Sequence, residues 1–477
     1  MQPFGILSIL LYLSAAMISP SLKQNLFLKI GQNTGILLVV NGVGAIMGFL
    51  MAAVLGRELG DAGFGQYSFV MTWLLSLALF TEFGVSTVIT RDVAAQPEQT
   101  QRYLINSLAA KSILSLPAIL MLLFAAPYLA VGQNPAVIGA LRWGVIFLWS
   151  SLVYSSFTAI FRAHQIMAPI LWLTLGGQLV LLTGTVWLVL QQQALFLIIA
   201  WAGLSQSLQC GLALVFYQKL KQAVPAEYLG EFKGTPMNSK FLRVPPSSYE
   251  FPVSSESSLE KNWSISNIFI KRLLVRAWPF ALAGILAALQ LRATVLILAY
   301  LQGDQALGWY AAANRFVETG KQLPGAFYSA MLPAMAAMAG ARTEVQSLAL
   351  QKTLSRSRLG LLAFGMAASL GALFLAQPIL TLTYGAEYQP ATLTLQILSF
   401  SLIPASQNSL LIIYLYACGD EKFVNLLTAV GLIANLGLCF WLIPTWGPAG
   451  VALALLIAES LLYGPYTMRT AYKKRKA

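Results

Sequence analysis

The sequence predicts an all-α polytopic membrane protein, with about 12 transmembrane helices in two parallel six-helix bundles around a central cavity. Composition, regularly spaced apolar runs and an alternating distribution of charge support this fold class. Of the 477 residues, 57% are hydrophobic and only 10% are charged, whereas a soluble domain carries roughly 25% charged residues. So little charge cannot cover a water-facing surface of this size, and we therefore expect lipid to be the main solvent.

Apolar runs long enough to cross a bilayer, about 20 residues each, recur along the chain. We place them at residues 35–55, 66–90, 104–129, 137–160, 170–190, 195–217, 278–300, 308–337, 359–376, 392–416, 423–443 and 448–468. Another apolar run, at residues 4–19, is short for a span and lacks the positive start of a signal peptide. Met17 is therefore an alternative start to Met1.

This pattern divides the chain into five parts. The middle connection is rich in Pro, Ser and Glu, and we expect its residues 224–262 to be largely disordered, because they cannot bury an apolar face. The parts are an N-terminal apolar run and amphipathic lead-in at 1–34, a six-helix bundle at 35–217, a cytoplasmic linker at 218–277, a second six-helix bundle at 278–468 and a basic cytoplasmic tail at 469–477.

The positive residues give the chain its expected direction. Most of the 30 Lys and Arg residues lie at the two ends and in every second connection, and positive residues tend to remain cytoplasmic. Both termini and the linker are thus predicted to be cytoplasmic. We attribute the net charge of +13 to this distribution of cytoplasmic positive residues and not to a nucleic-acid-binding face. Five residues do not fit the pattern: Arg57, Arg142, Arg292, Arg315 and Lys321.

Two matches between the halves indicate an internal duplication. Residues 60–67 (Gly-Asp-Ala-Gly-Phe-Gly-Gln-Tyr) align with residues 303–310 (Gly-Asp-Gln-Ala-Leu-Gly-Trp-Tyr) at an offset of 243, with four of eight positions identical. Spans five and eleven also match, from Thr174 and Thr428 onward. Each half has six spans, so the halves have the same orientation, and parallel repeats of this kind place a substrate cavity at their interface.

Several of these segments resemble a known superfamily. Residues 57–60 and 63–68 look like the end of the first span of polysaccharide-type flippases. Residues 81–84 with Arg91 and Asp92 resemble the end of their second span, and residues 308–315 with Leu332 and Pro333 resemble their eighth. From about residue 21 the chain is similar to the multidrug/oligosaccharidyl-lipid/polysaccharide exporter superfamily. The run at 4–19 and the long linker depart from its compact pattern.

The resemblance implies a role in surface polysaccharide biosynthesis. Its members move an undecaprenyl-diphosphate-linked oligosaccharide from the inner to the outer leaflet of the bacterial inner membrane by alternating access. We also consider the polysaccharide polymerase machinery as a candidate partner and H⁺ or Na⁺ as a candidate coupling ion, and we expect no cofactor.

The predicted eighth span carries the charges that best indicate a cavity. At 100° per residue its polar side chains fit an arc of about 160°, and charges within a span usually face a cavity. We expect Arg315, Lys321 and the preceding Arg292 to bind a diphosphate headgroup, since arginine supplies a fork of donors. Pairing of Glu318 with Arg315 or Lys321 is the structural alternative. The polar arc comprises Asn314, Arg315, Glu318, Thr319, Lys321 and Gln322.

Other charges within the spans leave two interpretations open. Glu82 is either a partner for one of these cations or a coupling carboxylate, and Glu459 has the same ambiguity. Arg57 stands at the outer mouth of the first span and either receives the headgroup or anchors the helix at the bilayer surface. Lys111 and Arg142 lie near span ends and are expected to snorkel to water.

Three functions remain as alternatives. A lipid-linked oligosaccharide flippase needs a cationic cavity, and basic residues dominate here. A cation-coupled multidrug exporter of the same superfamily should show acidic dominance instead. A membrane glycosyltransferase or ligase typically needs acidic residues at the membrane face or a large catalytic outer loop, whereas the predicted outer connections are short. No nucleophile–base pair or metal-ligand spacing is present in the sequence, so we expect no enzymatic activity.

Overall fold

The computed structural model describes residues 20–223, 265–322 and 344–476, with a few positions between 324 and 331. The apolar run at 4–19, the alternative start Met17 and linker residues 224–264 lie outside these residues. All the regular secondary structure in the described part is helical. Large apolar side chains such as Trp172, Phe374 and Trp441 are 66%, 75% and 73% exposed, as expected for a surface that faces lipid.

The first half of the chain forms one group of helices. The short 3₁₀ turn η1 (Pro97–Gln99) precedes α4. The helices are α2 (Pro20–Glu82), α3 (Val85–Ala95), α4 (Thr100–Phe124), α5 (Ala126–Leu129), α6 (Ala136–Ala163), α7 (Ala168–Leu190) and α8 (Leu195–Ala223). The predicted second span, 66–90, is interrupted, because Phe83 and Gly84 have φ of 49° and 68° and end α2 before α3 begins.

The second half forms the other group. The 3₁₀ turn η4 (Ala386–Tyr388) joins α12 to α13. The helices are α10 (Asn267–Gly320), α12 (Glu344–Thr383), α13 (Ala391–Ala417), α14 (Glu421–Trp446) and α15 (Pro448–Lys476). Nine helices within the described residues are long and apolar enough to cross a membrane, and one of them, Val39–Glu82, contains two predicted spans. The chain is a multi-pass membrane protein with an all-α fold of about twelve crossings, as the sequence predicts.

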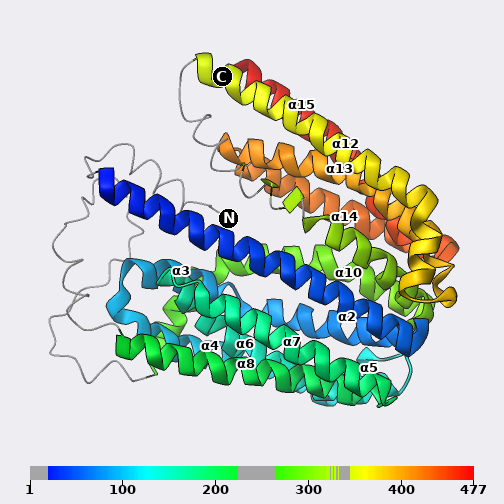
Figure 1. Ribbon diagram of the computed structural model, residues 1–477, viewed down its shortest axis with the longest axis horizontal. Helices are drawn as coiled ribbons and strands as arrows, with labels where there is room; N and C mark the ends of the chain where they lie inside the picture. Colours follow the sequence, from blue (N-terminus) through cyan, green and yellow to red (C-terminus); the bar gives the residue numbers. More distant parts are fainter. Residues whose placement is uncertain are drawn as a thin grey trace.

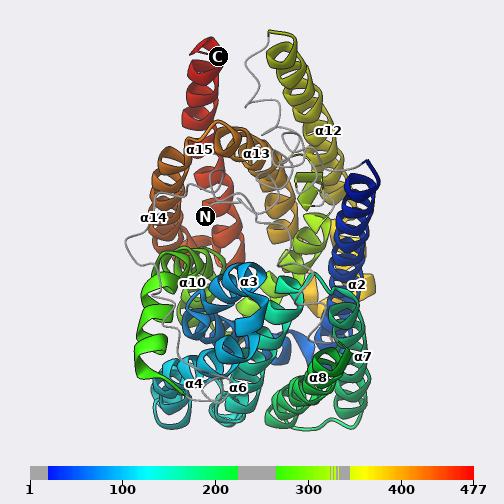
Figure 2. The same cartoon turned by 90° about the vertical axis from the view of Figure 1, so that its left-hand side faces the viewer.

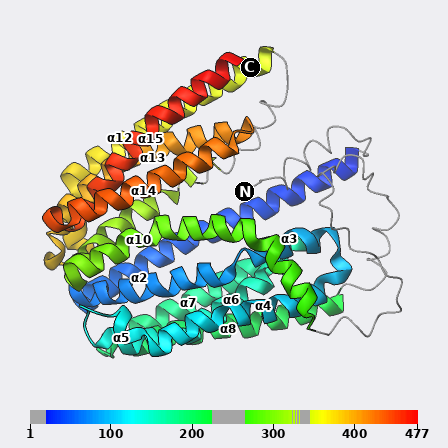
Figure 3. The same cartoon turned by 180° about the vertical axis from the view of Figure 1, so that it is seen from behind.

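The two helical groups meet along α2 and α10. Figure 1 shows α12–α15 above, α3–α8 below and these two helices between them. The groups converge at the end where α2 and α10 turn sharply and diverge toward the opposite end, as the view from behind also shows (Figure 3). Figure 2 looks along the bundle from the divergent end, where α12 and α15 stand apart from α3, α4 and α6.

Each turn is made by a single glycine and not by a loop. Gly60 in α2 has φ 72° and ψ 179°, and Gly303 in α10 has φ 79° and ψ −171°. Glycine adopts this region without the steric cost that a Cβ imposes. The equivalent glycines of the duplicated segment thus have nearly the same backbone conformation, which supports the duplication inferred from the sequence.

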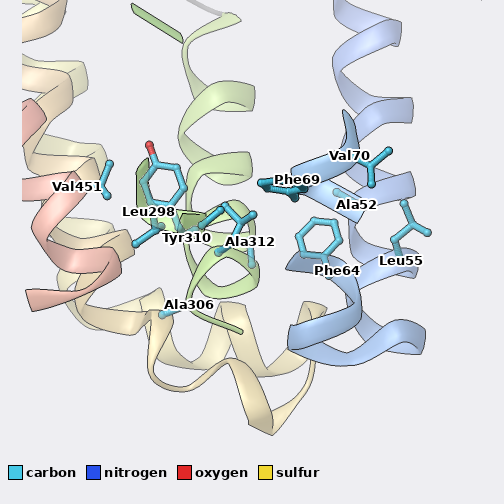
Figure 4. Packing of buried hydrophobic residues seen from close by; sticks show 14 of the residues in the cluster. Ala52, Leu55, Phe64, Phe69, Val70, Leu298, Ala306, Tyr310, Ala312 and Val451 are labelled. Atoms are coloured by element: carbon cyan, nitrogen blue, oxygen red, sulfur yellow. The ribbon is translucent and has the colours of Figure 1, made fainter. Parts of the chain in front are cut away.

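The largest buried cluster joins the halves beside these turns. It includes Leu55, Phe64 and Phe69 of α2 together with Leu298 and Tyr310 of α10. Figure 4 shows these side chains close to the bend of each helix. A separate cluster includes Phe269 and Leu273 at the start of α10 with residues of α3, α4 and α6. The start of α10 therefore packs on the first half, so α10 belongs in part to both helical groups.

Candidate functional site

Arg315 connects the two halves inside the molecule. It lies on the second segment of α10, and its Nε donates a hydrogen bond to the carbonyl oxygen of Gly48 on α2 at 3.1 Å. A Cβ at position 48 would lie only 2.0 Å from Arg315 Nη2. The missing side chain of Gly48 therefore provides the space that the guanidinium occupies.

Glu318 is the acidic partner of Arg315. Its Oε2 lies 3.4 Å from Arg315 Nη1, with side chains that are 47% and 32% exposed, and its Oε1 accepts a hydrogen bond from Asn314 at 3.0 Å. The ion pair that we considered as the structural alternative for Glu318 therefore forms, with Arg315 as the cation. Because ion pairs this exposed contribute only about 0–1 kcal/mol, a stronger anion could compete with Glu318.

Arg315 and Glu318 border a cavity of about 330 Å³ between α2, α7 and α10. Its charged wall comes from α10, and its neutral walls come from α2 and α7 of the first half. The lining residues are Val40, Asn41, Gly44 and Ala45 of α2, Thr174 and Gln178 of α7, and Arg315, Glu318, Thr319 and Gln322. One positive and one negative side chain face each other here, so the described lining has no net charge.

The sequence interpretation missed the neutral wall. Gln178 packs against α2, where a Cβ at Gly44 would lie 3.2 Å from its Nε2. Asn41, Gly44 and Gly48 lie at helical spacing on one face of α2. A polar residue followed by small residues on one face of an apolar run is the signal that could have identified this wall.

Arg292 and Lys321 do not line this cavity. Arg292 lies one segment earlier on α10, where the charges of Glu318 and Arg315 act on it, and its buried Nε has no hydrogen-bond partner within the described residues. Lys321 is exposed, and its positive charge acts on the carboxylate of Glu459. Of the three predicted headgroup cations, Arg315 alone borders the described cavity.

Glu459 lies within the second half. Its Oε2 accepts a hydrogen bond from Asn408 Nδ2 at 2.7 Å, and the same nitrogen donates to its backbone carbonyl at 2.8 Å. Asn408 is 2% exposed. This pair links α13 to α15 and is not part of the cavity.

Glu82 has a different partner from those considered in the sequence. Its Oε2 lies 2.7 Å from Lys111 Nζ, and it also accepts hydrogen bonds from the Ser86 backbone and the Ser155 hydroxyl. Lys111 is 1% exposed, so the expectation that it snorkels to water is wrong. Two serine hydroxyls and one carboxylate receive its three N–H groups, which makes the burial of the charge tolerable.

Arg57 lies in α2 just before the bend at Gly60, and Arg142 lies in the first turns of α6. Arg57 is exposed, and its Nη1 donates to the Leu382 carbonyl at the end of α12, at 3.4 Å. Arg142 Nε donates to the Leu123 carbonyl at 3.1 Å. Neither residue borders the cavity.

Together, the fold and the cavity define a multi-pass membrane protein with a polar cavity between two groups of helices. Two family models, both described as "Polysaccharide biosynthesis protein", match residues 30–244 and 253–393. Together these models cover well over half of the chain, which belongs to this polysaccharide biosynthesis family. No curated protein matches the chain.

Solved structures share this fold at low sequence identity. An inward-facing multidrug resistance MATE family transporter of the MOP superfamily has a TM-score of 0.66 and 14% identity, covering 91% of this chain and 96% of its own. The lipid II flippase MurJ, in an inward closed conformation, has a TM-score of 0.67 and 13% identity, with coverage of 91% and 87%. The Vibrio cholerae MATE transporter VcmN, in its bent form, has a TM-score of 0.54 and 16% identity, with coverage of 95% and 98%.

Proposed function

We propose that the protein is a flippase that moves an anionic lipid-linked oligosaccharide across the bacterial inner membrane for surface polysaccharide biosynthesis. The substrate is an undecaprenyl-diphosphate-linked glycan, carried from the cytoplasmic to the outer leaflet, and both chain termini are cytoplasmic. The observation that carries this proposal is Arg315, which lines a cavity between the two halves and contacts α2 of the first half.

The chemistry of Arg315 suits a diphosphate. A guanidinium forms bidentate, charge-assisted hydrogen bonds to phosphate oxygens, whereas its present partners are one carbonyl and one partly exposed carboxylate. The neutral amide and hydroxyl groups of Asn41, Thr174 and Gln178 are the donors and acceptors that sugar hydroxyls require. A headgroup at Arg315 thus leaves the first sugars near the neutral wall.

Replacement of Arg315 tests the proposal. We expect Arg315→Ala and Arg315→Lys to reduce the flipping of an undecaprenyl-diphosphate-linked oligosaccharide in proteoliposomes. The lysine variant should also be less active than the unmodified protein, because lysine lacks the planar fork of arginine. Arg142→Ala is the matched control, since it removes an arginine outside the cavity. Normal transport by both Arg315 variants, at normal protein level, would refute the headgroup role. Flipping with and without H⁺ or Na⁺ gradients tests coupling separately.

Glu318 favours a second candidate, a cation-coupled multidrug exporter. This carboxylate lines the cavity and is 47% exposed, so it could bind a cationic drug. In that case Glu318→Gln should abolish drug resistance in cells, and Arg315→Ala should preserve it. For a flippase we expect the reverse order, with Arg315→Ala the more damaging change for glycan export.

A further inference from the structure

The duplicated segments, residues 60–67 and 303–310, contact each other across the two halves. We call this contact the glycine clasp. Phe64 and Ala306, which are labelled in Figure 4, lie within its two segments. The segments occupy the end of the molecule where the two helical groups converge, which is the outer end by the distribution of positive residues.

The clasp is reciprocal at two glycines. A Cβ at Gly65 would lie 1.8 Å from the carbonyl oxygen of Asp304, and a Cβ at Gly308 would lie 1.9 Å from the carbonyl oxygen of Asp61. Non-bonded heavy atoms normally pack at about 3.5–4.0 Å. Backbone of one half is thus in direct contact with backbone of the other, twice, through equivalent positions.

Side-chain hydrogen bonds also join the two segments of the glycine clasp. Asp61 Oδ2 accepts hydrogen bonds from Gln305 Nε2 at 2.8 Å and from Trp309 Nε1 at 2.9 Å. In the opposite direction, Asp304 Oδ2 accepts one from Gln66 Nε2 at 3.0 Å. Asp61 is 8% exposed, and removing a partner from a buried carboxylate is costly. These bonds therefore resist separation of the two halves.

The turn η4 adds a third element to the glycine clasp. The Tyr388 hydroxyl lies 2.9 and 3.0 Å from the carbonyl oxygens of Gly56 and Gly60, beside the bend of α2. Trp309 Nε1 also lies 3.1 Å from the Glu387 carbonyl. The outer connection of the second half therefore packs over the bend of the first half.

We propose that the glycine clasp is the outer gate of the transporter, closed in this structure and opened when the halves separate at Gly65 and Gly308. This role rests on the proposed transport function. Alternating access requires the outer end to open while the inner end closes. The convergent end is closed by backbone contacts at Gly65 and Gly308 and by side-chain hydrogen bonds to Asp61 and Asp304. Opening there breaks the hydrogen bonds of Asp61 and Asp304 and the backbone contacts at Gly65 and Gly308.

Outside accessibility of the cavity tests the gate. In a chain with Cys210, Cys418 and Cys439 replaced by alanine, Thr319→Cys places a thiol on the cavity wall. We expect Gly65→Ala and Gly308→Ala to increase its labelling by a membrane-impermeant maleimide, added outside intact cells, by about tenfold, which corresponds to about 1.4 kcal/mol. Gly437→Ala is the control, because nothing lies within 4 Å of a Cβ there.

A further variant tests the gate without the steric clash that the added Cβ atoms introduce. Trp309→Phe removes a donor to Asp61 without adding bulk, and we expect a smaller increase in the same labelling. Unchanged outside labelling in all three variants, with normal protein levels, would overturn the gate. Labelling needs no glycan, so this outcome leaves the flippase proposal standing, whereas transport that survives loss of Arg315 would refute that proposal and not the gate.

Discussion

Arg315 on α10 donates a hydrogen bond from Nε to the carbonyl oxygen of Gly48 on α2, at 3.1 Å. One side chain thereby ties the second half to the first at the edge of the cavity. The same guanidinium is the group that we propose for the substrate diphosphate. Binding of a headgroup would compete with the contact to Gly48, so occupancy of the cavity and separation of the halves are linked at this residue.

Gly48→Ala should mimic the loss of Arg315. The new Cβ would lie 2.0 Å from Arg315 Nη2, so the guanidinium must leave its position. We expect Gly48→Ala to reduce flipping, and to add little further loss in the Arg315→Ala background, since coupled residues are non-additive. Gly42→Ala is the control, because nothing lies within 4 Å of its Cβ. Fully additive losses would show that Gly48 acts independently of Arg315.

Gln178→Leu should weaken glycan binding and leave the fold intact. The change keeps the side chain's approximate size and removes the amide that lines the neutral wall. An unpaired polar group costs about 1–3 kcal/mol, so we expect a severalfold or greater rise in the substrate concentration needed for half-maximal flipping. Gln191→Leu, at an exposed position just beyond α7, is the control. An unchanged half-maximal concentration would exclude Gln178 from substrate recognition.

The sequence was sufficient to predict the helical fold because its signals are local. Runs of apolar residues and the distribution of Lys and Arg need no knowledge of the partner helix. The repeat at Gly60 and Gly303 also showed that the two segments are equivalent. It could not show that they touch, because equivalence by duplication carries no information on distance.

The candidate site was only partly predictable for the same reason. Helical spacing placed Arg315 and Glu318 on one polar face, and both border the cavity. Spacing within α10 could not identify Gln178 on α7 as the opposite wall. The position of Lys111 near a span end predicts that its side chain reaches water. The sequence does not show that Glu82, which lies on another helix, forms an ion pair with it.

Removal of one partner of the Lys111–Glu82 pair should destabilise the protein. Lys111→Met leaves a partly buried carboxylate without its cation, and breaking a buried pair costs about 3–5 kcal/mol. We expect a clear fall in Tm in detergent for Lys111→Met and for Glu82→Ala. The double variant Lys111→Met with Glu82→Gln should recover part of the loss, since no charge is left unpaired. A double variant less stable than both single variants would contradict this view.

Asp420 should make stability sensitive to acid. It lies between α13 and α14, where hydrogen bonds from Arg469 at 2.5 and 3.0 Å, with Lys473 nearby, lower the pKa of its carboxyl below the ordinary value. The folded state therefore binds the proton less readily than the unfolded state. The stabilisation is fully present above the unfolded pKa, about 4, and is lost as pH falls through the folded pKa.

Asp420→Asn removes this contribution and tests its pH dependence. We expect a lower Tm than that of the unmodified protein at pH 7, and a difference that shrinks as the pH is lowered from about 5 toward 3. Thermal unfolding in detergent, followed by intrinsic fluorescence across this range, measures both. Glu421→Gln at the neighbouring position is the control for loss of one negative charge. A Tm difference that stayed constant with pH would mean that Asp420 stabilises the connection through its shape and not through its charge.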